Sequence, residues 1–196
     1  EQGKAAEILE AMRVASTSNS EGAVADVYPY LAGQTSLAAL IIPSWAQSGG
    51  RDAMLERFRD SELRARIIEE AEESMDFRWG GASGVFVGGQ QELTDIMNDM
   101  DTDSHGEAVI SVLEESDNGV ILRFGSEEDL IEVMQHPSVS IACDCDAAQE
   151  GEPVHPRYWG TFPKVLGEYV REKGVLTLEN AIYKMTALPA ETIGMK

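Results

Sequence analysis

The sequence predicts an α/β fold with a largely parallel sheet or barrel. Amphipathic helical stretches alternate with short apolar runs along the chain, as in repeated strand–helix units. The apolar run 139–143 ends on a lone carboxylate, Asp144, and α/β barrels place catalytic carboxylates at the carboxyl ends of their strands. About three to four strands are predicted, too few to close a barrel of about eight. We therefore expect an incomplete barrel.

The N-terminal segment predicts a helix followed by a strand. Apolar residues recur at helical spacing through residues 4–15, with charged residues on the other face. The polar turn 16–22 ends this helix, and the run 23–27 is typical of a short buried strand. Pro29 stops the strand because proline cannot continue a ladder.

The remaining elements continue this alternation. Ser126 begins one helix as a capping residue, and Thr177 precedes another. The expected elements are a loop or short helix at 35–45, helices at 51–59, 61–74, 92–100, 105–116, 126–136, 162–173 and 178–188, and strands at 80–89, 119–124 and 139–143.

Three segments are expected along the chain. The segment 50–117 is too long for an ordinary strand-to-helix connection, so we expect an inserted, mostly helical subdomain. Residues 1–49 then hold a barrel strand and helix, and residues 118–196 hold the last barrel strands and the C-terminal helices. The chain begins with Glu1 and opens inside a helical pattern, so we expect an internal piece of a longer polypeptide.

The composition excludes several classes of partner. Thirty-five acidic residues against 15 basic ones give a net charge of −20, which repels nucleic-acid phosphates and anionic membranes. Such a surface favours solubility or, alternatively, reflects adaptation to a saline environment.

Cys143 and Cys145 lie one residue apart, so they cannot join distant segments, and they lack the spacing of a zinc site. Nothing indicates an oxidising compartment, and we expect a cytoplasmic location.

Candidate site residues gather near the end of the chain. Asp144 can hold a metal ion or move a proton, although an Asp that turns the chain is an equal alternative, and Asp146 competes for the same role. Arg157 suits an anionic substrate, although a structural ion pair is its alternative. His155 is expected to orient the loop or to donate to substrate. Tyr28 follows the first strand, on the same expected face as Asp144.

Several sequence blocks together resemble the D-aminoacylases, or N-acyl-D-amino-acid deacylases, of the amidohydrolase superfamily, in their C-terminal portion. The most specific block runs from His155 to Gly167. The other blocks are Asp26–Gly33 with Thr35, Ser126–Asp129, His136-Pro137, Lys184–Thr186 and Leu188–Ala190. The chain departs from the family at Cys143 and Cys145, where members often carry Ser and Gly, and at Gln34.

The resemblance implies a zinc-dependent hydrolase on a (β/α)8 TIM barrel that splits N-acyl-D-amino acids into a carboxylate and a free D-amino acid. It implies that Asp144 is the catalytic acid/base and a candidate ligand for a second metal ion. It implies that Arg157 holds the substrate carboxylate, that Tyr28 helps to bind substrate, and that Thr35 lies in a loop lining the pocket. The main zinc ligands are expected upstream of Glu1, so the chain alone is expected to be inactive.

Two alternatives remain open from the sequence. One is an amidohydrolase that acts on a cyclic amide or a dipeptide. The other is a non-catalytic acidic interaction module, which would leave Asp144 exposed and away from Arg157 and Tyr28.

Overall fold

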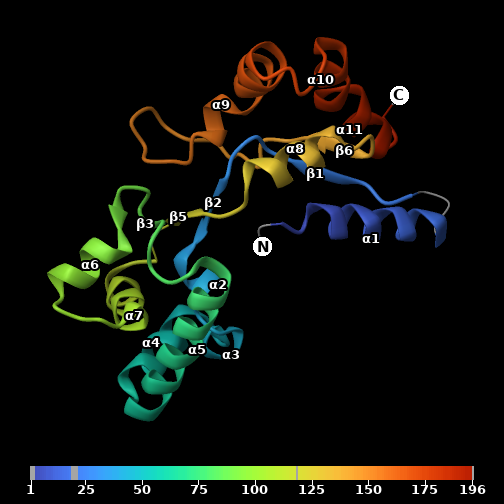
Figure 1. The fold of residues 1–196 in the computed structure, drawn as a ribbon. Helices are drawn as coiled ribbons and strands as arrows, with labels where there is room; N and C mark the ends of the chain where they lie inside the picture. Colours follow the sequence, from blue (N-terminus) through green and yellow to red (C-terminus); the bar gives the residue numbers. More distant parts are fainter. Residues whose placement is uncertain (1–2, 19–21, 118, 196) are drawn as a thin grey trace. The chain divides into compact units, whose positions relative to one another are not determined.

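The computed structural model of the protein describes residues 3–18, 22–117 and 119–195, so residues 19–21 of the expected polar turn lie outside it. The chain forms two compact units, each shown in Figure 1. Unit 1 combines Glu1–Leu31 with Phe124–Lys196, and unit 2 is Ala32–Arg123. Unit 2 thus begins before residue 50 and ends after residue 117, the bounds expected for the inserted segment. None of the helices in the described part of the chain has the length and apolarity needed to cross a membrane.

Unit 1 contains a parallel strand pair surrounded by helices. Its elements are α1 (Ala5–Ser18), β1 (Ala25–Val27), α8 (Glu127–Gln135), β6 (Val139–Ile141), α9 (Arg157–Lys164), the π-helix η1 (Val165–Glu172), α10 (Leu178–Met185) and α11 (Ala187–Thr192). Strands β1 and β6 run parallel, with Ala25 opposite Val139 and Val27 opposite Ile141. The expected parallel pairing is therefore present in this unit.

The core of unit 1 joins α8, β6 and the C-terminal helices. Its buried residues are Leu130, Met134, Ile141, Val165, Tyr169, Leu176 and Ala181. Lys184 is buried among them, and its ammonium donates to the carbonyl oxygens of His136 and Val139, at 2.5 Å and 2.8 Å. These bonds attach α10 to both ends of the turn before β6.

The cap expected at Ser126 is confirmed, and Asp129 in the same turn accepts from amides at the beginning of a second helix. Ser126 Oγ accepts from the Asp129 amide and caps α8. The Asp129 carboxylate accepts from the amides of Gly3 and Ala5, at the beginning of α1. These backbone hydrogen bonds hold the pKa of Asp129 below its ordinary value. One short motif thus ties the first helix of unit 1 to α8.

Unit 2 is built on an antiparallel sheet, so a largely parallel arrangement is wrong for this part of the chain. Its elements are β2 (Ala32–Ser36), α2 (Leu37–Ile41), α3 (Ser44–Gln47), α4 (Gly50–Arg59), α5 (Ser61–Trp79), β3 (Val85–Val87), β4 (Gln91–Glu92), α6 (Leu93–Asp99), α7 (His105–Glu115) and β5 (Gly119–Arg123). The strand order is β2-β5-β3-β4, and every neighbouring pair is antiparallel. Along β5 buried residues alternate with more exposed ones, so one face of the sheet packs on the core.

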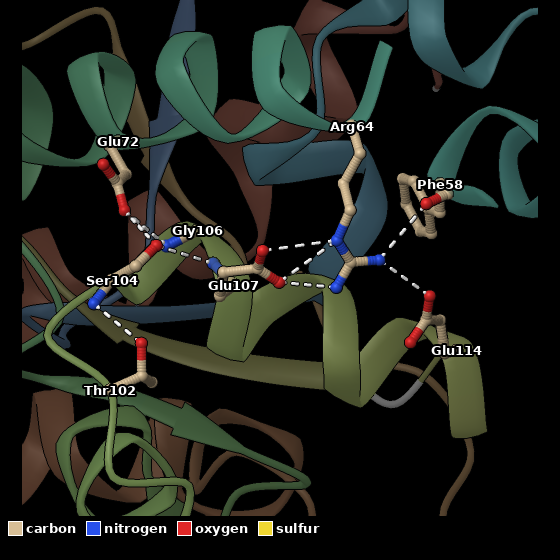
Figure 2. Close-up of polar contacts among 8 residues, drawn as sticks. All are labelled: Phe58, Arg64, Glu72, Thr102, Ser104, Gly106, Glu107 and Glu114. Atoms are coloured by element: carbon tan, nitrogen blue, oxygen red, sulfur yellow. Dashed lines mark hydrogen bonds and ion pairs between the residues drawn. The ribbon is translucent and has the colours of Figure 1, made fainter. Parts of the chain in front are cut away.

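A polar network joins α5 to α7 (Figure 2). The guanidinium of Arg64 bonds the carboxylates of Glu107 and Glu114. About two turns further along α5, the Glu72 carboxylate accepts from the Ser104 hydroxyl and, at 3.1 Å, from the Gly106 amide. Glu72 therefore accepts from donors in the N-terminal turn of α7, whose amides have no partner within the helix.

Close packing beside this network requires glycine at position 106. A Cβ atom there would lie 2.9 Å from Ile68 Cγ2 and 3.1 Å from the Ile68 carbonyl oxygen. We expect Gly106→Ala to lower the free energy of unfolding by about 1 to 2 kcal/mol, because overpacking outweighs the gain in helix propensity. Urea unfolding followed by tryptophan fluorescence measures the change. Gly167→Ala is the matched control, since its Cβ would meet nothing within 4 Å and should not destabilise; equal midpoints for both variants would contradict the packing argument.

Candidate active site

Asp144 and Tyr28 follow the two parallel strands of unit 1 at the same edge. The Ala142 amide donates to the Val27 carbonyl at 3.1 Å, which extends the ladder just past both strand ends. Tyr28 is the next residue on one side, and Asp144 lies two residues beyond on the other. Asp144 has φ +47°, a left-handed conformation that Asp tolerates better than most residues. The chain therefore turns sharply at this carboxylate.

Arg157 pairs directly with Asp144. Its Nη1 lies 2.8 Å from Asp144 Oδ2. The two partners differ in exposure: the Arg157 side chain is 7% exposed and the Asp144 side chain is 67% exposed. The buried cation is thus covered by protein, whereas the carboxylate faces outward from the described residues. The geometry that the interaction-module alternative requires, with Asp144 away from Arg157, is not found.

Tyr28 packs against the same cation. The Arg157 guanidinium carbon lies 5.0 Å from the centre of the Tyr28 ring, within range of a cation–π contact. Burial raises the pKa of the Tyr28 phenol above its ordinary value, and the charge of Arg157 offsets part of that rise. The phenol therefore stays protonated at neutral pH and can donate a hydrogen bond. The structure brings together three of the predicted site residues: Tyr28, Asp144 and Arg157.

His155 supports Arg157 from within the protein. It is 1% exposed, and its Nδ1 accepts from the Arg157 backbone amide at 3.0 Å. Its ring packs edge-on against Tyr30, with centroids 5.1 Å apart, and lies 6.3 Å from the Tyr28 ring. Of the two roles expected for His155, this geometry favours the one that orients the chain.

Tyr30 holds the beginning of α9. Its hydroxyl donates to the Pro156 carbonyl at 3.3 Å. A Cβ atom on Gly160 would lie 2.4 Å from that hydroxyl oxygen, so the contact depends on glycine at position 160. The Tyr30 ring also packs against that of His155, so Tyr30 contacts both residues that precede Arg157.

Arg157 lies on a helix rather than in a loop, so the predicted helix start at residue 162 is wrong. Pro156 precedes Arg157, and proline suits the first turn because its missing amide would have no helical partner there. Pro163 inside the helix has no amide to donate, and the helix changes to π-helical hydrogen bonding from Val165 onward. Two prolines that suggest interruption are thus accommodated within one continuous helical segment.

Cys143 and Cys145 form a disulfide, which the sequence reasoning missed. Their Cα atoms are 5.0 Å apart, within the usual range for a disulfide. The signal was present, because these are the only cysteines of the sequence and are separated by Asp144 alone. A bond between two cysteines this close joins no distant segments, so it differs from the structural disulfides that cysteine spacing usually indicates.

A pocket of about 450 Å³ opens beside Asp144 and Tyr28 within unit 1. Asp26 and Asp129 also line the pocket, and neither was predicted as a site residue from the sequence. Apolar side chains, among them Leu31 and Phe124, form much of the remaining wall. The pocket suits a ligand with an apolar part beside the Asp144 carboxylate.

The other predicted residues lie elsewhere. Thr35 lies in strand β2 of unit 2, opposite Val120 of β5, so the loop expected at this residue is wrong, and its part in a substrate pocket stays a prediction. Within the described residues, no group of three or more His, Cys, Asp or Glu side chains is placed to hold a metal ion. Asp144 offers a single exposed carboxylate, which fits a metal only where other residues hold it.

Sequence comparisons identify relatives over parts of the chain. All three relatives named here come from Alcaligenes xylosoxydans xylosoxydans. An N-acyl-D-glutamate deacylase is 43% identical over 77 residues, covering 39% of this chain and 15% of that protein. A D-aminoacylase is 50% identical over 50 residues, covering 26% and 10%. An N-acyl-D-aspartate deacylase is 34% identical over 105 residues, covering 54% and 20%. No protein-family model matches the chain.

Structural comparisons cover nearly the whole chain. The crystal structure of an N-acyl-D-glutamate deacylase from Bordetella bronchiseptica, complexed with zinc and a phosphonate inhibitor, matches with a TM-score of 0.66 at 24% identity. It covers 99% of this chain and 33% of that one. A D-aminoacylase with a binuclear metal centre also matches with a TM-score of 0.66, at 25% identity, covering 98% and 33%. The resemblance to the D-aminoacylases is confirmed, and the chain spans about a third of the length of these structures.

Proposed function

We propose that this chain, similar in sequence and fold to the N-acyl-D-amino-acid deacylases, supplies the proton-transfer and substrate-anchoring residues of such an enzyme. The enzyme hydrolyses the amide of an N-acyl-D-amino acid to a carboxylate and a free D-amino acid. The observation that carries the proposal is the Asp144–Arg157 pair beside Tyr28, at the carboxyl ends of two parallel strands. A carboxylate and a cation for an anionic substrate thus lie next to each other.

We propose further that β1 and β6 are neighbouring strands of an incomplete (β/α)8 barrel. Their parallel pairing and the preceding helices α1 and α8 support this, as does the likeness to D-aminoacylase structures. Unit 2 is then an insertion between β1 and α8, at the end of the strand that carries Tyr28. Thr35 in β2 stays a proposed substrate-pocket residue on the resemblance to the D-aminoacylases alone.

Asp144 performs proton transfer in this proposal. Its carboxylate accepts the proton of the attacking water and delivers it to the amine nitrogen as the C–N bond breaks. Its exposed side chain leaves it accessible to substrate. Zinc, when bound by other residues of the enzyme, lowers the pKa of the attacking water and polarises the amide carbonyl.

Arg157 anchors the substrate carboxylate. A guanidinium presents five donors in a planar fork, so it can bind a carboxylate in a bidentate manner. Burial against Tyr28 holds that fork in one orientation. Its pairing with Asp144 places the anchored carboxylate next to the proton-transfer group. The substrate carboxylate is then expected to share or displace Asp144 on the guanidinium.

Turnover assays with zinc test this function. We expect the intact enzyme to release free amine from N-acetyl-D-amino acids but not from the L-enantiomers. The 196-residue chain alone should release none, because its described residues form no metal-binding group. Absence of turnover by the intact enzyme with every N-acyl-D-amino acid would overturn the proposal. Turnover by the 196-residue chain alone would overturn the inference that the zinc ligands lie outside this chain.

The role of His155 can be tested by a pair of substitutions. His155→Leu leaves the Arg157 amide without its acceptor, a loss of about 1–3 kcal/mol that the backbone avoids by shifting Arg157. Because the shifted guanidinium binds the substrate carboxylate less well, KM should rise about tenfold. His155→Asn places an amide oxygen near the position of Nδ1 and should restore most of the loss. Steady-state kinetics of both variants provide the measurement. Equal impairment of the two would indicate that the ring itself, rather than its acceptor, is needed.

A further inference from the structure

The Cys143–Cys145 disulfide encloses the backbone of Asp144. Only Asp144 separates the two cysteines, so the bond closes a small covalent ring through the N, Cα and C atoms of Asp144. Cys145 is exposed and Cys143 is half-buried, so a small thiol or disulfide in solution can reach the bond. No other disulfide occurs within the described residues, and this one lies at the residue that we place in proton transfer.

The ring constrains the conformation on which the Asp144–Arg157 pair depends. Asp144 has φ +47°, in the left-handed region that L-residues other than glycine disfavour. Its carboxylate reaches Arg157 from that conformation, at 2.8 Å. When the disulfide is opened, the residues on either side of Asp144 are no longer joined, and the extended conformations usual after a strand become accessible. Loss of the bond is therefore expected to move the carboxylate away from Arg157.

We propose that Cys143 and Cys145 are a reversible redox site that controls the alignment of Asp144. The disulfide form is the aligned form, and the dithiol form is the less active one. The effect on activity rests on the proposed function of Asp144, whereas the redox site itself does not. The ligand class is a low-molecular-weight disulfide for oxidation and a thiol for reduction.

The exchange is balanced in two steps. One cysteine thiolate attacks a sulfur of the small disulfide, forming a mixed disulfide as the external S–S bond breaks and one small thiolate leaves. The second cysteine thiolate then attacks the protein sulfur of that mixed disulfide and expels the other small thiolate. The cysteine pair loses two electrons and two protons, and the small disulfide becomes two thiols. Reduction runs through the same steps in reverse.

Redox titration of the intact enzyme tests this proposal. The enzyme is equilibrated at a series of ratios of reduced to oxidised glutathione, and free thiols are trapped with an alkylating reagent. Mass spectrometry of the peptide containing Asp144 then gives the fraction of the pair that is oxidised. We expect a reversible transition within this series, and kcat for an N-acetyl-D-amino acid to fall along the same curve. The fall should be roughly 5- to 30-fold, the factor by which non-glycine residues avoid the left-handed region.

The double variant C143S/C145S is the control for cysteines elsewhere in the enzyme. Its activity should be independent of the glutathione ratio and close to that of the reduced wild-type protein. A redox response of the same size in this variant would overturn the proposal, as would a pair that stays wholly oxidised or wholly reduced at every ratio. Hydrogen exchange of residues 142–157 gives a readout independent of turnover. Faster exchange on reduction supports the proposal even where the deacylase assignment fails, and unchanged exchange overturns it.

Discussion

Replacing Asp144 by Asn in the intact enzyme is expected to lower kcat by about 10²- to 10⁴-fold, the usual contribution of a positioned acid/base. Asparagine has nearly the same shape and still accepts a hydrogen bond from Arg157, but its amide cannot take up and return the proton. KM should change little by comparison, because the anchoring cation remains in place. Steady-state kinetics with an N-acetyl-D-amino acid, at saturating zinc, measure both constants.

Asp146 provides the matched control for this substitution. It lies two residues further along the same loop, is exposed, and accepts from the neighbouring Ala147 amide at 2.8 Å. Asp146→Asn makes the same chemical change and removes the same charge, and it should leave kcat within about twofold of wild type, as expected of a surface substitution. If the two variants lost activity equally, Asp144 would not be the proton-transfer group. A fully active Asp144→Asn enzyme would lead to the same conclusion.

The positions of Tyr28 and Asp144 at the ends of two strands were predictable from the sequence. Tyr28 and Asp144 each come directly after a short apolar run, and parallel strands bring their carboxyl ends to one edge. The cap at Ser126 was equally local, because the hydroxyl and the amide that it accepts from are three residues apart. These features depend on neighbours in the sequence or on one general rule of parallel sheets.

The rest depends on contacts between distant residues. The strands at 80–89 and 119–124 were recognised, but an apolar run does not specify strand direction, and their antiparallel pairing emerges only in the folded unit. Proline ordinarily marks a helix boundary, so a helical segment that begins at Arg157 and continues through Pro163 was not expected. The buried position of Arg157 results from packing against Tyr28, which is far away in the sequence.

Arg157 separates the deacylase from a hydrolase of cyclic amides, because an N-acyl amino acid presents a free carboxylate that Arg157 would bind and a cyclic amide does not. We expect Arg157→Gln to lower kcat/KM for N-acetyl-D-amino acids by about 30-fold to several thousand-fold, the range found when one member of a buried charge pair is removed (2–5 kcal/mol). Arg157→Lys keeps the charge without the planar fork and should fall in between. Arg171→Gln removes an exposed cation from η1 and should have little effect, which controls for the change in net charge.

The comparison of substrates separates anchoring from the alignment of Asp144. A carboxamide analogue of the substrate lacks the negative charge, so the wild-type enzyme should prefer the free acid strongly, whereas Arg157→Gln should lose most of that preference. Loss of the Asp144 contact lowers kcat for both substrates alike and leaves their ratio unchanged. The ratio of kcat/KM values therefore reports on anchoring alone. A ratio that Arg157→Gln does not alter, together with turnover of cyclic amides, would favour the alternative amidohydrolase over the deacylase.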